Sequence, residues 1–283
     1  MASKKIFTAV FSYNRPLHLE NCLQSLKDMY PDAHVVVFDD NSPNVAVDEV
    51  IQKFDCEVRK GKGGSGRHGG LYDNMQMAYE EAIEGGYDYL LALQDDMQIV
   101  RPVDGKILMQ FDEAFALDPS IASLEPRFAK GQRQAINPPP GPAPLTAEPS
   151  AFRDYLDVSL LHIGRLAEKK WSFHLDRHYL VSGEQTLSIR ASEMGLRRYR
   201  FATPFTMHVP FPHLYRNRLR LPRLSGLRGR IFRYEYMSQS DIECMDNRPK
   251  DEPAYWREHL KVEDANWFDR LLLSSKNDAK VLA

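Results

Sequence analysis

The stretch Tyr87-Asp-Tyr-Leu-Leu-Ala-Leu-Gln-Asp-Asp-Met97 carries the clearest structural signal in the chain. Residues 89–93 form an apolar run with the length of a buried strand, and the run is soon followed by Asp95-Asp96. Adjacent carboxylates repel each other unless a cation or hydrogen-bond donors neutralise them. Ligands bind at the carboxyl ends of strands in open α/β sheets. The pair therefore marks either a ligand site or a polar loop whose acids cap the next helix.

Strand-like and helix-like segments alternate along the first half of the chain. Apolar, β-branched and aromatic runs predict strands at residues 5–12, 34–38, 57–59, 88–94 and 121–124. Apolar residues at helical spacing predict helices at residues 16–30, 46–54, 71–84 and 107–115. This alternation predicts an α/β fold with a mostly parallel central sheet and helices on both faces.

The pattern weakens in the second half. The prolines between residues 137 and 149 are not expected to form regular helix or sheet, so an extended loop is predicted there. Residues 178–190 resemble a strand broken at Gly183, residues 205–209 a further strand, and the tail from Trp256 an amphipathic closing helix or two. We expect this region to be less regular than the first half.

Composition places the protein among ordinary globular chains. Its 283 residues suffice for one large α/β domain, and 43% of them are hydrophobic. The three cysteines are far apart and lack metal-ligand spacing, which predicts a reducing cytoplasm rather than a disulfide framework. No apolar run approaches the length that spans a bilayer, so any membrane contact is expected to be peripheral.

Three predicted strands end in polar loops that should lie side by side. The loops contain Ser12-Tyr13-Asn14-Arg15, Asp39-Asp40-Asn41-Ser42 and Gln94-Asp95-Asp96. Two acidic strand ends beside an aromatic ring and an arginine indicate a nucleotide site. The ring can stack on a base, the carboxylates can accept from base and ribose, and a metal can hold the diphosphate.

The ordered motifs resemble those of a family 2-type glycosyltransferase with the GT-A fold. The motifs are Val10-Phe-Ser-Tyr-Asn-Arg-Pro16, Val35-Val-Val-Phe-Asp-Asp-Asn-Ser42, Asn74 and Leu93-Gln-Asp-Asp96. The resemblance covers residues 5–125 closely and 178–213 loosely. It implies transfer of a sugar from a nucleotide-diphosphate sugar, most readily a UDP-sugar, to a hydroxyl of a carbohydrate, lipid-linked or other acceptor. Inversion at the anomeric carbon is implied by the resemblance alone.

The resemblance also implies roles for single residues on the donor side. Asp95 would contact ribose or metal, and Asp96 would coordinate Mn²⁺ or Mg²⁺, hard cations that accept carboxylate and phosphate oxygens. The other donor-binding candidates are Phe11 and Tyr13 flanking the base, Asp40 accepting from it, Arg15, and Arg67 and Asn74 near base or ribose.

The chain departs from the family pattern on the acceptor side. An Asp often stands two residues before the acidic pair, where this chain has Leu93, and the Glu-Asp motif that supplies the base is not evident. Glu184 is the first candidate for the base and Asp241 the second. His208 and His213 compete as a third metal ligand.

Other functions stay open at this point. Gly61-Lys-Gly-Gly-Ser-Gly66 satisfies the dinucleotide fingerprint of NAD(P)-dependent enzymes, but it does not follow the first strand, where that fingerprint belongs. A nucleotidyltransferase would show an early glycine-rich loop that is absent after residue 12. A non-catalytic nucleotide-sugar-binding protein remains an alternative, because the Glu-Asp motif that supplies the base is not evident.

Arginine and leucine alternate closely in residues 214–233, which predicts a surface for an anionic acceptor or for the inner face of a membrane rather than for nucleic acid. We expect four regions. They are a nucleotide-sugar-binding half (1–130), a Pro-rich loop (131–150), an acceptor-side half (151–213), and a basic segment with C-terminal helices (214–283).

Overall fold

The computed structural model describes residues 4–62, 70–128, 143–144, 156, 158–175, 183–209, 233–247 and 262–263. The elements of the first half alternate between strand and helix, as predicted. They are β1 (Ile6–Ser12), α1 (Pro16–Met29), β2 (His34–Asp39), α2 (Ala46–Lys53), β3 (Glu57–Lys60), α3 (Leu71–Glu84), β4 (Tyr89–Gln94), β5 (Met97–Ile99), α4 (Gly105–Ala116) and β6 (Ile121–Glu125).

The second half contributes shorter elements. They are β7 (Ala143–Pro144), β8 (Ser159–His162), α5 (Ile163–Glu168), α6 (Gly183–Glu193), β9 (Arg197–Arg200), β10 (Thr206–His208), β11 (Arg233–Tyr234), α7 (Gln239–Asp246) and β12 (Val262–Glu263). The strand predicted at residues 205–209 is confirmed as β10.

One central sheet joins both halves, in the strand order β3-β2-β1-β4-β8-β6-β9-β7. Strands β3, β2, β1 and β4 pair in parallel, and β8 lies antiparallel between β4 and β6. Because β8 reverses the direction twice, β6 again runs with β4, and β9 pairs with it in parallel. The carboxyl ends of six strands therefore meet at one edge of the sheet.

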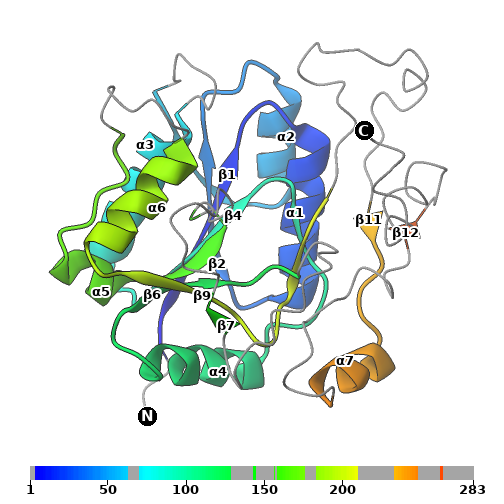
Figure 1. The fold of residues 1–283 in the computed structure, drawn as a ribbon. Helices are drawn as coiled ribbons and strands as arrows, with labels where there is room; N and C mark the ends of the chain where they lie inside the picture. Colours follow the sequence, from blue (N-terminus) through cyan, green and yellow to red (C-terminus); the bar gives the residue numbers. More distant parts are fainter. Residues whose placement is uncertain are drawn as a thin grey trace, which may run out of the picture.

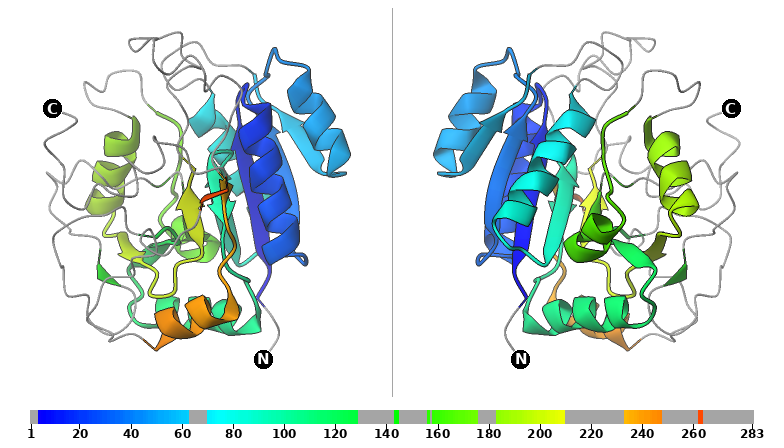
Figure 2. Two further views of the ribbon diagram at one scale, coloured as in Figure 1. Left: turned by 90° about the vertical axis from the view of Figure 1, so that its right-hand side faces the viewer. Right: turned by 90° about the vertical axis from the view of Figure 1, so that its left-hand side faces the viewer.

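Helices cover both faces of this sheet (Figures 1 and 2). On one face, α1, α2 and α4 bury apolar side chains against residues such as Val10 and Leu91. On the other face, α3, α5 and α6 pack on the alternate strand residues, among them Phe7 and Leu90. Apolar residues on both sides of a strand are what a sheet buried on two faces requires. The predicted α/β layout is confirmed.

The strand predicted across residues 178–190 is wrong where the structure describes it, because Gly183–Glu193 form the helix α6. Residues 183 and 187 share one helical face, and both are buried. A Cβ on Gly183 would overlap the Tyr72 ring of α3 and lie 2.7 Å from Leu175. Close packing of α6 on α3 therefore explains the helix, whereas the local sequence suggested alternation.

The Pro-rich segment also differs from expectation at two residues. Ala143 and Pro144 pair antiparallel with β9 as the edge strand β7. Proline lacks a backbone N–H, so it is tolerated on an edge strand. Arg67, His213 and residues 214–232 lie outside the described residues, as does the tail from Trp256 apart from Val262 and Glu263. These two residues form the strand β12, so the helix expected in the tail is wrong at these positions. Within the described part, no helix has the length and apolarity needed to cross a membrane.

We predict that Gly183→Ala loosens the contact between α6 and α3. The added methyl group cannot fit without moving a buried ring, which costs about 1–3 kcal/mol in a packed core. Urea unfolding followed by circular dichroism measures this loss. Gly105→Ala is the matched control, because a Cβ there meets nothing within 4 Å and alanine favours the first turn of α4. Equal stability of the two variants would contradict the packing argument.

Candidate functional site

The three polar strand ends predicted from the sequence lie side by side at the carboxyl edge of the sheet. In the parallel registers, Ser12 faces Asp39 and Phe11 faces Gln94. The backbone N–H of Asp40 donates to Ser12 O at 2.9 Å, and that of Asp95 donates to Phe11 O at 3.0 Å. The loops after β1, β2 and β4 therefore form one continuous polar floor.

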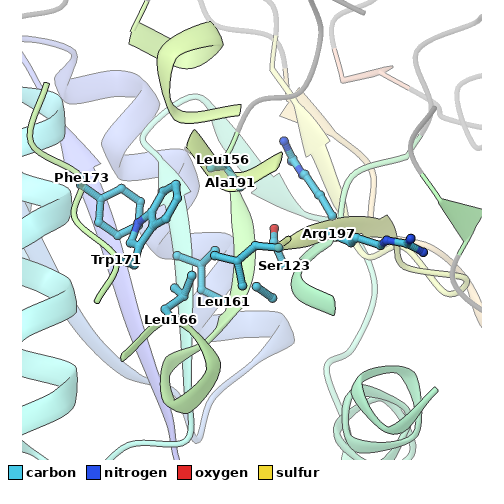
Figure 3. A pocket seen from close by; sticks show the side chains of 11 residues that line it. Ser123, Leu156, Leu161, Leu166, Trp171, Phe173, Ala191 and Arg197 are labelled. Atoms are coloured by element: carbon cyan, nitrogen blue, oxygen red, sulfur yellow. The ribbon is translucent and has the colours of Figure 1, made fainter. Parts of the chain in front are cut away.

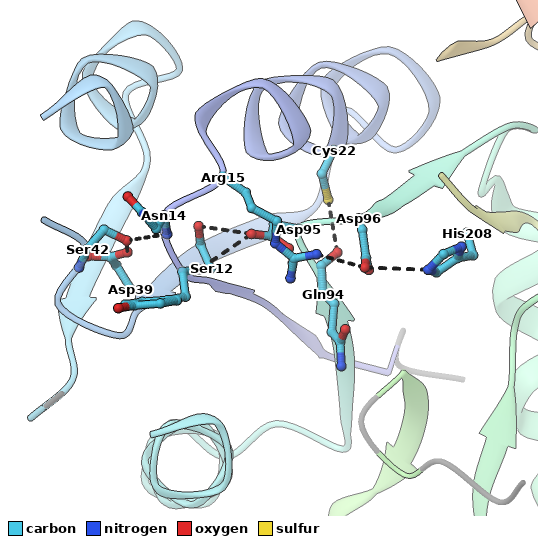
Figure 4. Close-up of polar contacts among 11 residues, drawn as sticks. Ser12, Asn14, Arg15, Cys22, Asp39, Ser42, Gln94, Asp95, Asp96 and His208 are labelled. Atoms are coloured by element: carbon cyan, nitrogen blue, oxygen red, sulfur yellow. Dashed lines mark hydrogen bonds and ion pairs between the residues drawn. The ribbon is translucent and has the colours of Figure 1, made fainter. Parts of the chain in front are cut away.

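Asp95 is completely buried in this floor. Its Oδ2 accepts from Ser12 Oγ and from the Tyr13 backbone N–H, both at 3.4 Å. Its Oδ1 lies 2.5 Å from Arg15 Nη2 (Figure 4). The end of β1 and the loop that follows it thus supply all three of these contacts.

Asp96 stands between Arg15 and His208. Arg15 Nη1 donates to Asp96 Oδ2 at 2.8 Å, and His208 Nε2 lies 3.5 Å from the same oxygen (Figure 4). His208 reaches this position because β10 pairs antiparallel with β5, which places His208 opposite Met97. The second carboxylate oxygen, Asp96 Oδ1, is buried without a hydrogen-bond partner.

The pKa values of the two carboxyl groups are shifted in opposite directions. Burial raises the pKa of Asp95 to about 7; Arg15 opposes this shift, and the charge of Asp96 adds to it. Burial also acts to raise the pKa of Asp96, but the His208 hydrogen bond and the Arg15 charge outweigh it and lower that pKa overall. Asp96 is therefore the carboxylate of the pair that stays ionised.

Asp39 and Asp40 are adjacent in the sequence, but they form different contacts. Asp39 accepts from the backbone N–H and the hydroxyl of Ser42 and from Lys60 Nζ, so it holds the loop after β2. Asp40 is 6% exposed and accepts from the Gly70 N–H at 2.7 Å, and its Oδ1 has no hydrogen-bond partner. Asp40 thus retains an acceptor for a ligand.

The other donor-side candidates differ in access. Tyr13 is 48% exposed, whereas Phe11 is 3% exposed and packs on Phe38 with ring centroids 5.7 Å apart. Of the two rings, Tyr13 is the one available for stacking. Asn74 is buried, and its side chain lies against Gly61, whose N–H donates to Asp39 O.

The two candidate bases lie at different places in the fold. Glu184 is half-buried in the first turn of α6, and Gly183 beside it packs on Tyr72, near the start of α3 and therefore near Asp40. Asp241 forms the capping box of α7 with Ser238. In Figures 1 and 2, α7 lies beside α4, away from the carboxyl edge. The structure brings Glu184, and not Asp241, towards the edge.

A divalent cation fits the chemistry of Asp96 and His208. The site offers an ionised carboxylate with one unpartnered buried oxygen and an imidazole nitrogen beside it. Mg²⁺ and similar ions need only one or two protein carboxylates when phosphate oxygens and water complete the shell. No cluster of three or more His, Cys, Asp or Glu side chains suited to a metal occurs among the described residues. These groups therefore suit a metal that arrives with a diphosphate.

An apolar pocket lies between the sheet and helices α5 and α6 (Figure 3). Leu161, Leu166, Trp171 and Phe173 are among its lining residues, and its volume is about 20 Å³. Such a volume accommodates about one water molecule. The pocket is too small for a nucleotide, so the acidic edge is the better candidate site.

Comparisons with known proteins agree with this geometry. Residues 8–141 match the family described as Glycosyl transferase family 2. Residues 1–349 of S. aureus TarS superpose with a TM-score of 0.53 at 15% identity, over 72% of this chain and 60% of that one, both alone and in complex with UDP. The structure of GalNAc-T7 with UDP, GalNAc and Mn²⁺ superposes with a TM-score of 0.51 at 10% identity. The superposition covers 73% of this chain and 44% of GalNAc-T7.

The chain thus spans less than two thirds of the length of these structures, and at such identities the likeness shows the fold. No curated protein matches the sequence. Residues 8–141, a little under half of the chain, thus match the glycosyltransferase family 2 model, and the chain has the GT-A fold of these solved structures.

Proposed function

We propose that the protein transfers a sugar from a nucleotide-diphosphate sugar, most readily a UDP-sugar, to a hydroxyl group of an acceptor in glycoconjugate synthesis. One observation carries the proposal: Asp40, Asp95, Asp96 and Arg15 converge with His208 at the carboxyl edge of parallel strands. Solved structures of the same fold contain UDP in TarS, and UDP with Mn²⁺ in GalNAc-T7.

The donor would lie along the polar floor. The exposed ring of Tyr13 would stack on the base, and Asp40 Oδ1 would accept a hydrogen bond from it. Asp95 would accept a hydrogen bond from the ribose or support Asp96, the carboxylate that would hold the metal. Asp96 and His208 would hold Mn²⁺ or Mg²⁺, which when bound stabilises the charge of the departing diphosphate.

The acceptor hydroxyl would lose its proton to a carboxylate on the acceptor side. Glu184 is the candidate that the fold favours, because α6 begins near α3 and Asp40. The deprotonated oxygen would attack the anomeric carbon in a single displacement. A single displacement inverts that carbon, in keeping with the resemblance noted in the sequence.

Asp96→Ala should abolish metal-dependent transfer and leave the fold intact, because it removes the ionised carboxylate at the centre of the site. The measurement is release of nucleoside diphosphate from a panel of UDP- and GDP-sugars, with and without Mn²⁺. Asp48→Ala, an exposed acid on α2, serves as the control and should keep full activity. Full activity of Asp96→Ala would refute the site. Release of pyrophosphate or oxidation of a nicotinamide would instead identify another enzyme class.

Glu184→Gln should lower kcat for transfer by about 10²-fold or more and leave the KM for the donor unchanged, since general bases contribute about 10²–10⁴-fold. Asp241→Asn is the matched comparison and should retain kcat, because its carboxylate caps α7. Steady-state kinetics with saturating acceptor separates the two variants. A large loss in Asp241→Asn alone would reverse the assignment.

Arg15→Met should lower the free energy of unfolding by about 3–5 kcal/mol, since it leaves two buried carboxylates without their shared cation. Arg15→Lys keeps one charge and should lose less. Urea unfolding measures both variants. Mn²⁺ should stabilise the Met variant more than the wild type, because the ion then replaces the missing charge. An unchanged unfolding midpoint in Arg15→Met would rule out this role.

A further inference from the structure

A segment late in the chain packs against β5, which follows Asp96, and against β10, which carries His208. It comprises residues 233–247, which contain β11 and α7, and it is called here the C-terminal segment. Strands β5 and β10 pair antiparallel, with Met207 opposite Gln98. The C-terminal segment contacts both strands, although it lies more than a hundred positions from β5 in the sequence.

The side chain of Gln98 anchors the backbone of the C-terminal segment. Gln98 Oε1 accepts from the Tyr234 N–H at 2.9 Å, and Gln98 Nε2 donates to Tyr234 O at 2.6 Å. Asn21 Nδ2 donates to the same Oε1 at 3.1 Å. Gln98 is 2% exposed, and a buried amide is costly unless its hydrogen bonds are made. The amide of Gln98 and the backbone of Tyr234 therefore hold each other in place.

Further contacts hold the C-terminal segment against the chain that follows β5. The Met237 N–H donates to Val100 O at 2.8 Å. Asp246 accepts from Arg101 Nη1 at 3.0 Å and from Lys106 Nζ at 2.8 Å. An apolar cluster also joins the segment to its neighbours, and it contains Val100, Phe128, Met207, Val209, Tyr234, Met237 and Met245. The segment is thus fixed at several points along its length, and not at Tyr234 alone.

The anchored ring of Tyr234 contacts the backbone of His208. The Tyr234 hydroxyl donates to His208 O at 3.2 Å, and the N–H of the next residue, Val209, donates to Asp96 O at 2.8 Å. The peptide group between residues 208 and 209 is therefore bound through its oxygen and through its N–H. The imidazole of His208 extends from the Cα beside this peptide group, with Nε2 3.5 Å from Asp96 Oδ2 (Figure 4). The orientation of the peptide group thus sets where the imidazole lies.

We propose that Tyr234 is a positioning residue for His208, and that Gln98 acts through Tyr234. The hydroxyl holds the end of β10 so that the imidazole lies beside Asp96 before a divalent cation binds. A ligand that is already in place loses less freedom on binding, which favours affinity for the ion. The metal role of His208 rests on the proposed function, whereas the position of its imidazole rests on the contacts of Tyr234.

The test measures Mn²⁺ binding to the full chain in the presence of saturating UDP, from the electron paramagnetic resonance signal of free Mn²⁺. Tyr234→Phe keeps the ring in the apolar cluster and removes only the hydroxyl. It should raise the dissociation constant of Mn²⁺ about fivefold, as the net loss of one hydrogen bond does. Gln98→Met, which removes the anchor of Tyr234, should raise the constant by at least as much.

Tyr236→Phe is the matched control. It removes a second hydroxyl from the C-terminal segment, but this hydroxyl donates to Asp28 of α1, so the dissociation constant of Mn²⁺ should stay unchanged. In steady-state kinetics, Tyr234→Phe should raise the apparent KM for Mn²⁺ and keep kcat at saturating Mn²⁺. A general loss of folded protein would lower kcat instead.

A second readout needs no metal. In the metal-free protein, the imidazole C–H resonance of His208, assigned from its loss in His208→Gln, should shift or broaden in Tyr234→Phe and stay in place in Tyr236→Phe. An unchanged resonance in Tyr234→Phe, or an unchanged affinity for Mn²⁺ where the wild type binds the ion, overturns the positioning role. Absence of Mn²⁺ binding to the wild type overturns the metal role in the proposed function, and the resonance still decides whether Tyr234 positions His208. The two ideas can therefore fail separately.

Discussion

The ion pairs of Arg15 with Asp95 and Asp96 are the constraint on which the candidate site depends. Two adjacent carboxylates are buried at the end of β4, and such a pair is stable only when a cation or hydrogen-bond donors offset the repulsion. Arg15 can reach both because β1 and β4 are direct neighbours and the loop after β1 turns back over the end of β4. In that loop Asn14 has a positive φ of 56°, and its N–H donates to Ser42 Oγ. The position of the charge is therefore set by backbone geometry as well as by the ion pairs.

The same arrangement leaves hydrogen-bond acceptors at the site that a ligand can use. One guanidinium offsets two carboxylates, and single oxygens of Asp40 and Asp96 lack hydrogen-bond partners. A donor with its metal would bring both hydrogen-bond donors and positive charge to these atoms.

Much of the first half was predictable from the sequence because its signals are local. Buried parallel strands appear as continuous apolar runs, and residues 71–84 show a regular helical stripe that the structure confirms as α3. The proximity of the loops that contain Asp40 and Asp95 could be predicted, because both loops follow strands of one parallel sheet. The separate role of Asp39 could not be predicted, because it depends on the turn to Ser42 and on Lys60 from β3.

The second half was less predictable because tertiary contacts determine it. Polar and apolar residues alternate at positions 186–189, as they would in a strand. These residues nevertheless belong to the helix α6, in which Gly183 packs on Tyr72. Strand β8 has only four residues, and its place between β4 and β6 depends on partners far away in the chain. The contact of Arg198 with Glu125 joins residues that are 73 positions apart, so no local motif shows it.

The insertion of β8 has a consequence for the order of folding. Strands β3, β2, β1 and β4 pair through connections that are complete once residue 94 has been made. β6 has no neighbour in the sheet until residues 159–162 arrive to join it to β4. Closing that long loop is entropically slow, and until then both β4 and β6 present unpaired edges. The half of the sheet that carries the acidic pair can therefore form first during synthesis, and the half that contains β8, β6 and β9 completes the edge afterwards.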